Sequence, residues 1–161
     1  VTYFYAIFKF MEKLFKTASF TRSTLVKIME KRSNEELLKI PENYNNSIFW
    51  NIAHLLVTQQ LICYKLSGLK IKIDESMVSK YGKGSIATED TDVADIQYVK
   101  NHILDLSQEI EHDYDKGLFK DFNPYMTSTG IELRSIEDAI SFGAFHDGIH
   151  LGVILSLMKI V

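Results

Sequence analysis

Apolar residues recur at helical spacing in four long segments of the chain, and polar residues lie between them. The segment from Ser47 to Ser67 is apolar almost all round, which predicts a deeply buried helix. Gly68 follows this segment, where a left-handed residue often ends a helix. The first segment predicts an amphipathic helix that ends at about Lys31, with an apolar stripe at Phe4, Phe8, Met11, Phe15, Ala18, Leu25 and Met29.

Local start and stop signals predict the other two long helices. The segment 92–116 keeps helical periodicity, and Gly117 follows it. Ser135 and Asp138 are close to the pattern of a capping box. We therefore expect the fourth long helix to begin at Ile136 and to run to the C-terminus.

Shorter elements are expected between these helices. Ser33 and Glu36 have the spacing of a capping box, which predicts a short helix that Pro41 ends. The polar, glycine-containing connection 69–91 predicts a long loop with one short helix near 74–80.

The predicted fold class is all-α. A second irregular stretch covers 118–134, and hardly any segment shows the alternating pattern of a strand. Four long amphipathic helices favour a four-helix bundle with long loops between the main helices. A chain of 161 residues fits one domain, so we expect a single domain over residues 1–161.

Composition and charge narrow the possible partners. The net charge is −3 and the basic residues are scattered, so we expect no nucleic-acid binding. Cys63 is the single cysteine, which excludes an intramolecular disulfide framework and favours a reducing, cytoplasmic location. The aromatic run 1–10 meets charged residues from Lys9 onward and lacks the features of a signal peptide. We therefore expect no membrane segment.

Three histidines in the most apolar helices form the candidate site. His146 and His150 are four residues apart, which places both imidazoles on one helical face, and His54 could supply a third nitrogen from a facing helix. Three nitrogen ligands leave coordination positions open, as a catalytic metal requires. The sequence thus predicts one divalent metal ion, and imidazole suits zinc, nickel, iron and copper alike.

Ordinary core packing is the alternative explanation. A pair of histidines four apart also arises by chance, and a lone buried histidine is commonly a hydrogen-bonded core residue. The metal interpretation is favoured because an unpaired imidazole is costly to bury. His102 and His112 lie in the polar third helix and are expected at the surface.

The pattern of residues in the fourth helix predicts that His146 and His150 face the core. One stripe has the spacing of a core face; it contains Ala139, Gly143, His146, His150, Val153 and Leu157. Gly148 and Gly152 lie on another face. Because glycine lowers helix stability, glycines at 143, 148 and 152 suggest close packing or a nearby ligand. Asp147 points about 100° away from His146 and is not expected to bind the metal.

Asn51 and Thr58 are candidates to orient the ligands or a substrate. They lie three residues before and four residues after His54, so they share its helical face. The alternative is that both simply satisfy their own hydrogen bonds in a buried helix.

The chain resembles the DinB-like superfamily, also described as DinB/YfiT-like metalloenzymes. The resemblance rests on three segments: Trp50-Asn-Ile-Ala-His54, Thr127-Ser-Thr-Gly130 and the closing His146-Asp-Gly-Ile-His150-Leu-Gly152. It implies a four-helix bundle, often a homodimer, in which three histidines bind a divalent metal. These histidines correspond to His54, His146 and His150. Many relatives have glutamine where this chain has Val153.

The resemblance implies a class of reaction. Characterised relatives include transferases that use low-molecular-weight thiols such as bacillithiol or mycothiol, and a thiol-dependent isomerase. Our leading hypothesis is a metal-dependent thiol transferase acting on a small-molecule substrate, with a metal-activated hydrolase as its nearest variant. The competing hypothesis is a non-catalytic metal-binding or dimeric interaction bundle. Metal affinity is expected to fall below about pH 6, where free imidazoles become protonated.

Overall fold

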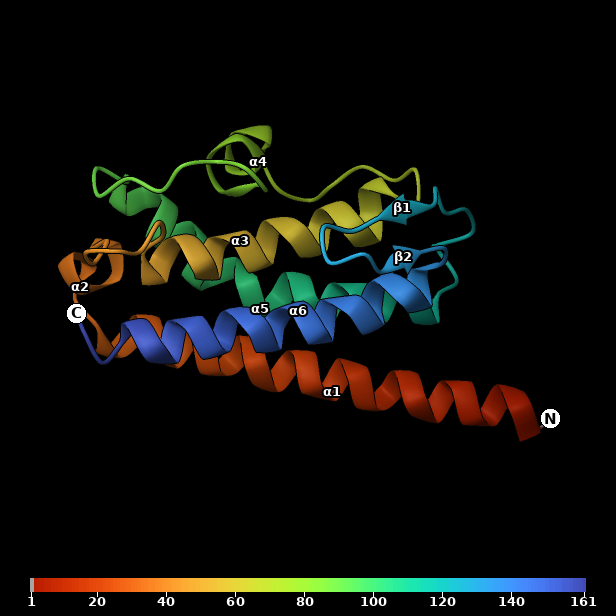
Figure 1. The fold of residues 1–161 in the computed structure, drawn as a ribbon. Coiled ribbons are helices and arrows are strands. Elements are labelled where there is room, and N and C mark those ends of the chain that lie inside the picture. Colours follow the sequence, from red (N-terminus) through yellow and green to blue (C-terminus); the bar gives the residue numbers. More distant parts are fainter. Residues whose placement is uncertain (1) are drawn as a thin grey trace.

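Four long helices dominate the computed structural model, which describes the backbone of residues 2–161 and the side chains from Tyr5 onward (Figure 1). Three short helical segments and one small two-stranded sheet accompany them in this range. The predicted all-α fold class is therefore confirmed. The long helices are α1 (Thr2–Lys31), α3 (Ile48–Gln60), α5 (Val93–Asp115) and α6 (Ile136–Leu157).

The long helices run in two directions. In Figure 1, α1 and α6 run one way, whereas α3 and α5 run the other way. Each helix contacts two others, so that α1, α5, α3 and α6 follow one another around the core. Because α3 and α5 are parallel, the connection between them must return along the length of both helices. This requirement explains the long segment 69–91, which also contains the short helix α4 (Glu75–Tyr81).

The predicted helix starts are confirmed by their caps. Ser33 Oγ accepts a hydrogen bond from the Glu36 backbone N–H, and the Glu36 carboxylate accepts one from Ser33 N–H, so α2 (Asn34–Leu38) begins with a capping box. Ser47 and Ser135 cap α3 and α6 through their hydroxyl groups, which accept hydrogen bonds from the backbone N–H groups of Trp50 and Asp138.

Glycines end two of the long helices, also as predicted. Gly68 and Gly117 have φ angles of 71° and 65°, which β-carbons disfavour. Before Gly68, α3 continues into a π-helical segment, η1 (Leu61–Lys65), where Leu66 N–H donates to Leu61 O. Hydrogen bonds between residues five apart bring Leu66 onto the same face as Leu61.

The region 118–134 contains a small hairpin that the sequence analysis did not predict. Strands β1 (Tyr125–Met126) and β2 (Glu132–Leu133) pair antiparallel. Thr127 Oγ accepts a hydrogen bond from Ile131 N–H inside the turn. Strands of two residues are too short to show an alternating pattern, so periodicity could not reveal them.

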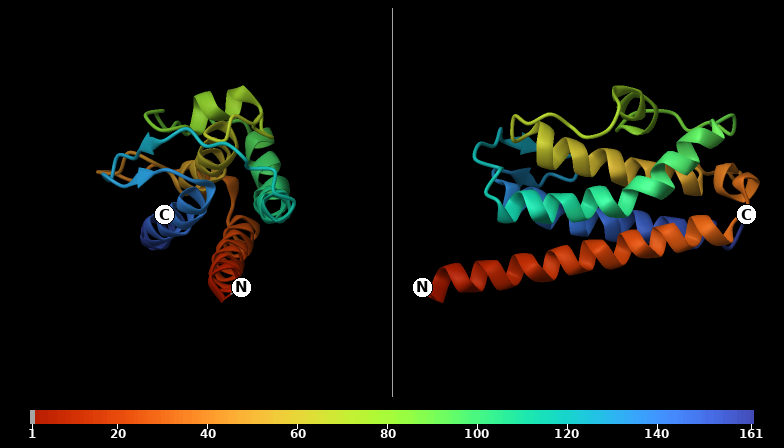
Figure 2. Two further views of the ribbon diagram at one scale, coloured as in Figure 1. Left: turned by 90° about the vertical axis from the view of Figure 1, so that its right-hand side faces the viewer. Right: turned by 180° about the vertical axis from the view of Figure 1, so that it is seen from behind.

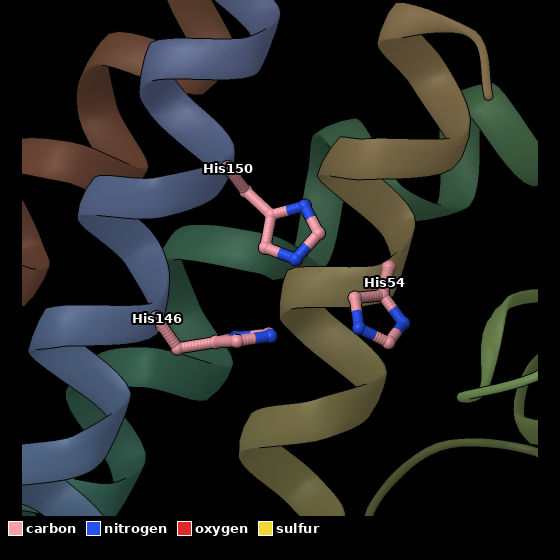
Figure 3. A group of neighbouring side chains, drawn as sticks. All are labelled: His54, His146 and His150. Carbon is pink, nitrogen blue, oxygen red and sulfur yellow. The ribbon is translucent and has the colours of Figure 1, made fainter. Parts of the chain in front are cut away.

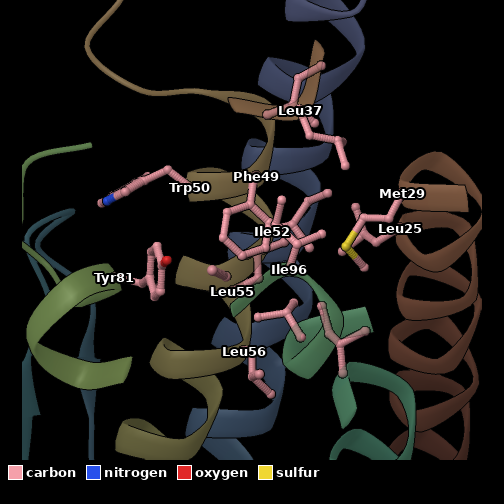
Figure 4. Close-up of a cluster of buried hydrophobic side chains, with 14 of the residues drawn as sticks. Leu25, Met29, Leu37, Phe49, Trp50, Ile52, Leu55, Leu56, Tyr81 and Ile96 are labelled. Carbon is pink, nitrogen blue, oxygen red and sulfur yellow. The ribbon is translucent and has the colours of Figure 1, made fainter. Parts of the chain in front are cut away.

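The apolar core is divided into two clusters along the bundle. One cluster contains Leu25 of α1, Leu55 of α3 and Ile154 of α6, and Figure 4 shows part of it. The other cluster contains Phe15 of α1 and Phe142 of α6, together with Ile62 of η1 and Leu133 of β2. His54 lies within the part of α3 that belongs to the first cluster. Between the two clusters lie buried polar side chains, which are Arg22 on α1, Gln60 on α3, Ser107 on α5 and Asp147 on α6.

Among the side chains that the structure describes, two that were predicted in the core are exposed; the side chain of Phe4, also predicted there, lies outside the described part. Phe8 is 54% exposed, because the N-terminal end of α1 projects beyond the other helices (Figure 2). On α6, Ala139 and Leu157 are buried as predicted, but Val153 is 36% exposed and Ile154 is fully buried instead. A helix turns every 3.6 residues, so the core face passes from His150 to Ile154 and then to Leu157.

Helix α6 is long and apolar enough to cross a membrane by length and composition alone. In the structure it packs against α1 and α3. A helix of such composition inside a bundle is weak evidence for a membrane span. The absence of a membrane segment therefore stays a prediction.

Candidate metal centre

The three predicted histidines come together between α3 and α6. His54 projects from α3 toward His146 and His150 of α6 (Figure 3). One ring nitrogen from each lies within 4.8 Å of the others. The ring centroids of His146 and His150 are 4.5 Å apart. The ring centroid of His54 lies 5.3 Å from that of His146 and 5.0 Å from that of His150. Nitrogens at this separation could hold one metal ion.

His54 is oriented by the end of α4. Its Nδ1 lies 2.7 Å from the backbone oxygen of Tyr81. Because a carbonyl only accepts, Nδ1 must carry the proton, which leaves the lone pair on Nε2. The Trp50 ring stacks on the imidazole at a centroid distance of 4.7 Å and further restricts its rotation.

His150 is oriented by Asn51 through a chain of hydrogen bonds. Asn51 Nδ2 donates to Ser47 O at 2.8 Å, which fixes the amide so that its oxygen faces α6. Asn51 Oδ1 then accepts from His150 Nδ1 at 2.8 Å. His150 Nε2 consequently keeps its lone pair for a metal. Imidazole ligands in metal sites are held in this way by carbonyl partners.

His146 is held by packing. Its ring lies nearly parallel to that of Phe142, with centroids 5.8 Å apart. Among the described residues, neither ring nitrogen of His146 has a hydrogen-bond partner that would fix its tautomer. Either nitrogen is therefore available to a metal.

Burial keeps the three imidazoles neutral. Desolvation lowers the pKa of His54, although the hydrogen bond to Tyr81 opposes the shift. Desolvation, with the nearby histidines and Arg22, lowers the pKa of His146 to about 3. Desolvation also lowers the pKa of His150 to about 4, and the charges of His54 and Arg22 contribute to this shift. At neutral pH the site therefore presents lone pairs, which metal binding requires.

Thr58 lies at the same site, but its hydrogen bond to a histidine is longer than that of Asn51. Its hydroxyl is 3.3 Å from His54 Nε2, on the side where a metal would bind. Thr58 also lines the cavity described below, whereas Asn51 is 2% exposed and lies behind His150. The two residues thus differ in position: Asn51 orients His150, and Thr58 lines the cavity.

An ion pair that the sequence analysis missed lies beside the histidines. Arg22 Nη2 donates to Asp147 Oδ1 at 2.8 Å, and both side chains are almost completely buried. Arg22 Nε and Nη1 are buried without a hydrogen-bond partner in the described structure. Asp147 points away from the metal ligands, as predicted. No local signal reveals the pair, because 125 residues separate its members.

A cavity of 340 Å³ opens beside His54 and His146. The hairpin and η1 form most of its wall, together with Lys83 of the connection 69–91. Of the described residues that line the cavity, none is an aspartate or a glutamate. The lining residues besides the two histidines are Thr58, Leu61, Ile62, Lys65, Leu66, Lys83, Tyr125, Thr127, Ser128, Thr129 and Phe142.

The other residues with reactive or polar side chains lie elsewhere. His102 and His112 are exposed on α5, as predicted. Burial raises the pKa of the Cys63 thiol to about 12, so this cysteine is not a nucleophile. Gly148 and Gly152 are exposed, and within the described structure no atom lies within 4 Å of a β-carbon built on either. The expected close packing at these two glycines is therefore absent from the described chain.

The donor set fits a divalent transition metal. Three neutral imidazoles suit zinc, nickel, iron or copper, and two of them are oriented by oxygen partners. The group of possible ligand side chains found in the described residues contains these three histidines and no carboxylate or thiolate. Such a set would leave positions on the ion open toward the cavity.

Comparison with known proteins agrees with this geometry. None of the curated proteins matches the chain. A family model described as the DinB superfamily matches residues 17–154, which include all three histidines and most of the four long helices. The chain therefore belongs to the DinB superfamily.

Proposed function

We propose that this protein is a metal-dependent enzyme that transfers a low-molecular-weight thiol to a small electrophilic substrate. The observation that carries the proposal is the three-histidine group, of which His54 and His146 line an open cavity. A structural metal site is normally closed by a fourth protein ligand, whereas a catalytic site keeps a position open. The geometry thus favours catalysis over a purely structural ion.

The residues around the cavity favour a thiol over water as the nucleophile. A bound divalent ion would lower the pKa of a thiol or of water at its open position. Hydrolysis by water also needs a general base, and no carboxylate lines the cavity in the described structure. Cys63 is buried and protonated, so the reacting thiol must come from a cofactor.

The protein's own side chains would bind and orient the reactants. Asn51 and the Tyr81 carbonyl hold two imidazoles in one tautomer, with their Nε2 atoms directed at the ion. The apolar side chains of Leu61, Ile62 and Phe142 would exclude water from the reacting groups. Thr58 lies near enough to His54 to donate a hydrogen bond to a reactant beside the ion.

Metal content tests the first part of this proposal. We expect about one ion per chain in protein purified without an affinity tag, measured by elemental analysis. The variant His54→Ala/His146→Ala/His150→Ala should lose the ion. The exposed pair His102→Ala/His112→Ala provides a matched control and should keep it. Absence of an ion from the wild type, even after incubation with zinc, nickel and iron, would support a non-catalytic bundle.

Turnover tests the second part. The metal-loaded protein is assayed with bacillithiol or mycothiol and a chromogenic electrophile, and separately with an ester or amide. Thiol consumption that depends on His146 supports the transferase. Hydrolysis without thiol would favour the metal-activated hydrolase, and a bound metal with neither activity would favour the non-catalytic alternative.

Location and assembly remain part of the proposal. A single cysteine agrees with a reducing, cytoplasmic location. We also expect a homodimer that associates through the exposed face of α6. No feature of the charge distribution favours nucleic acid as a partner.

A further inference from the structure

Two lysines line the cavity that adjoins the three histidines. Lys65 belongs to η1, and Lys83 lies in the connection 69–91, two residues after the Tyr81 carbonyl that holds His54. Both are exposed. They come from two different segments of the chain and line the same cavity.

These two lysines differ from their neighbours in having no acidic partner. Lys72 forms ion pairs with Glu109 and Asp113, and Lys80 pairs with Asp95. Within the described residues neither Lys65 nor Lys83 forms an ion pair. Among the described residues, no aspartate or glutamate lines the cavity. The two charged side chains that line this cavity are therefore both positive, although the net charge of the chain is −3.

We propose that Lys65 and Lys83 bind an anionic group, a carboxylate in particular, of the molecule whose thiol reaches the histidine site. This inference rests on the proposed function and names the substrate class. A ligand with a thiol at one end, an apolar middle and a negative charge at the other end matches the lining of the cavity.

The spacing along the helix sets the length of that ligand. Lys65 follows His54 by eleven residues, which corresponds to about 16 Å along a helix. Lysine side chains are long and lean toward the helix N-terminus, so the ammonium group lies closer to the histidines than its α-carbon. The anionic group must then be separated from the thiol by several bonds, so we choose a six-carbon chain for the test.

Binding of matched thiols to the cobalt(II)-loaded protein tests the inference. The probes are 6-mercaptohexanoate, which is anionic, and 6-mercaptohexan-1-ol, which is neutral and has the same chain length. The absorption band of cobalt with a thiolate ligand gives the Kd without turnover. We expect the wild type to prefer the anionic thiol by about tenfold.

The double variant Lys65→Met/Lys83→Met should lose that preference and still bind the neutral thiol like the wild type. Lys120→Met is the matched control, since Lys120 is an exposed lysine that does not line the cavity. It should keep the preference. Equal Kd values for the two thiols in the wild type, or a preference that survives in the double variant, would overturn the inference.

A second pair of probes separates this inference from the proposed function. Binding of 4-phenylbutyrate and 4-phenylbutan-1-ol, which carry no thiol, is measured by ligand-observed NMR. If no thiol binds cobalt but the carboxylate binds through the lysines, the anion site holds and the thiol reaction fails. If both thiols bind cobalt equally and 4-phenylbutyrate shows no lysine-dependent preference, the anion site fails and the thiol reaction stands.

Discussion

At the scale of a single residue, Asn51 holds His150 of the candidate metal site although it does not line the cavity. Its amide is fixed by Ser47 O and holds His150 in one tautomer. The variant Asn51→Ala leaves His150 free to rotate and to place its proton on Nε2. We expect metal affinity to fall about 10- to 100-fold, measured by competition with a chelator.

The control for this prediction is Asn101→Ala, which removes an asparagine from an exposed position on α5. Its metal affinity should equal that of the wild type. An unchanged affinity in Asn51→Ala would show that packing alone orients His150.

The histidines make the stability of the metal-free protein depend on pH. Their pKa values are lowered by folding, to about 3 for His146 and about 4 for His150. Between these values and the ordinary pKa near 6.5 the unfolded chain binds more protons than the folded chain. The free energy of unfolding must therefore fall as the pH falls from about 6.5.

Urea unfolding of the metal-free protein at pH 7.5 and pH 5 measures this effect. We expect lower stability at pH 5, and a smaller difference between the two pH values in His146→Gln/His150→Gln, whose side chains do not titrate. The same pH dependence in both proteins would contradict the assignment. Because the folded imidazoles stay neutral below pH 6, the loss of metal affinity is also expected at lower pH than for free imidazole.

Sequence reasoning found the histidines but not the arginine beside them. His146 and His150 share a helical face, and His54 stands alone in an aliphatic segment, so their spacing is visible in the sequence. Arg22 is buried because Asp147 meets it from the opposite end of the chain. Arginine in an amphipathic helix ordinarily lies at the surface, and no local pattern marks the exception.

At the scale of the elements, the Arg22–Asp147 pair connects α1 to α6 directly beside a metal ligand. Removing one partner leaves a buried, unpaired charge. We expect Arg22→Met or Asp147→Leu alone to lower the free energy of unfolding by about 3–5 kcal/mol. Urea unfolding of the metal-free variants measures the loss.

The double variant Arg22→Met/Asp147→Leu serves as the comparison. It removes both charges and also the two unpaired N–H groups of Arg22. An apolar replacement of a buried ion pair is often neutral or stabilising, so we expect the double variant to be more stable than either single variant. Losses that simply add would show that the two side chains do not interact.

Helix ends were predictable, whereas the arrangement of the helices was not. Ser33, Ser47, Gly68 and Gly117 act on backbone groups within a few residues, so the sequence carries their effect locally. The parallel direction of α3 and α5 depends on contacts between distant segments. The hairpin at 125–133 is fixed by the bonds of its turn and not by any periodic pattern.

At the scale of the whole molecule, the candidate site lies against both clusters of the core. On α6 the two histidines and Asp147 lie between Phe142 of one apolar cluster and Ile154 of the other. Trp50 of the first cluster stacks on His54, and Phe142 of the second stacks on His146, so both clusters hold the site. A rigid frame on both sides is what a preorganised metal site needs.

The outer face of α6 indicates where a second copy would bind. Phe145, Ile149 and Val153 are between 36% and 49% exposed and follow one another at helical spacing. Gly148 and Gly152 lie on the same exposed face with open space above them, which would allow another helix to approach closely. A face of this kind suits a two-fold contact between identical helices.

We expect the wild type to have twice the mass of the chain in size-exclusion chromatography with light scattering. Val153→Arg places a charge in the proposed contact, three residues beyond His150, and should give a monomer that still binds one metal ion. Ile86→Arg is the control, because Ile86 is 89% exposed and lies in the connection 69–91. It should remain a dimer. A monomeric wild type would exclude this assembly, whereas a dimer that tolerates Val153→Arg would place the contact on another face and leave the α6 glycines without a partner.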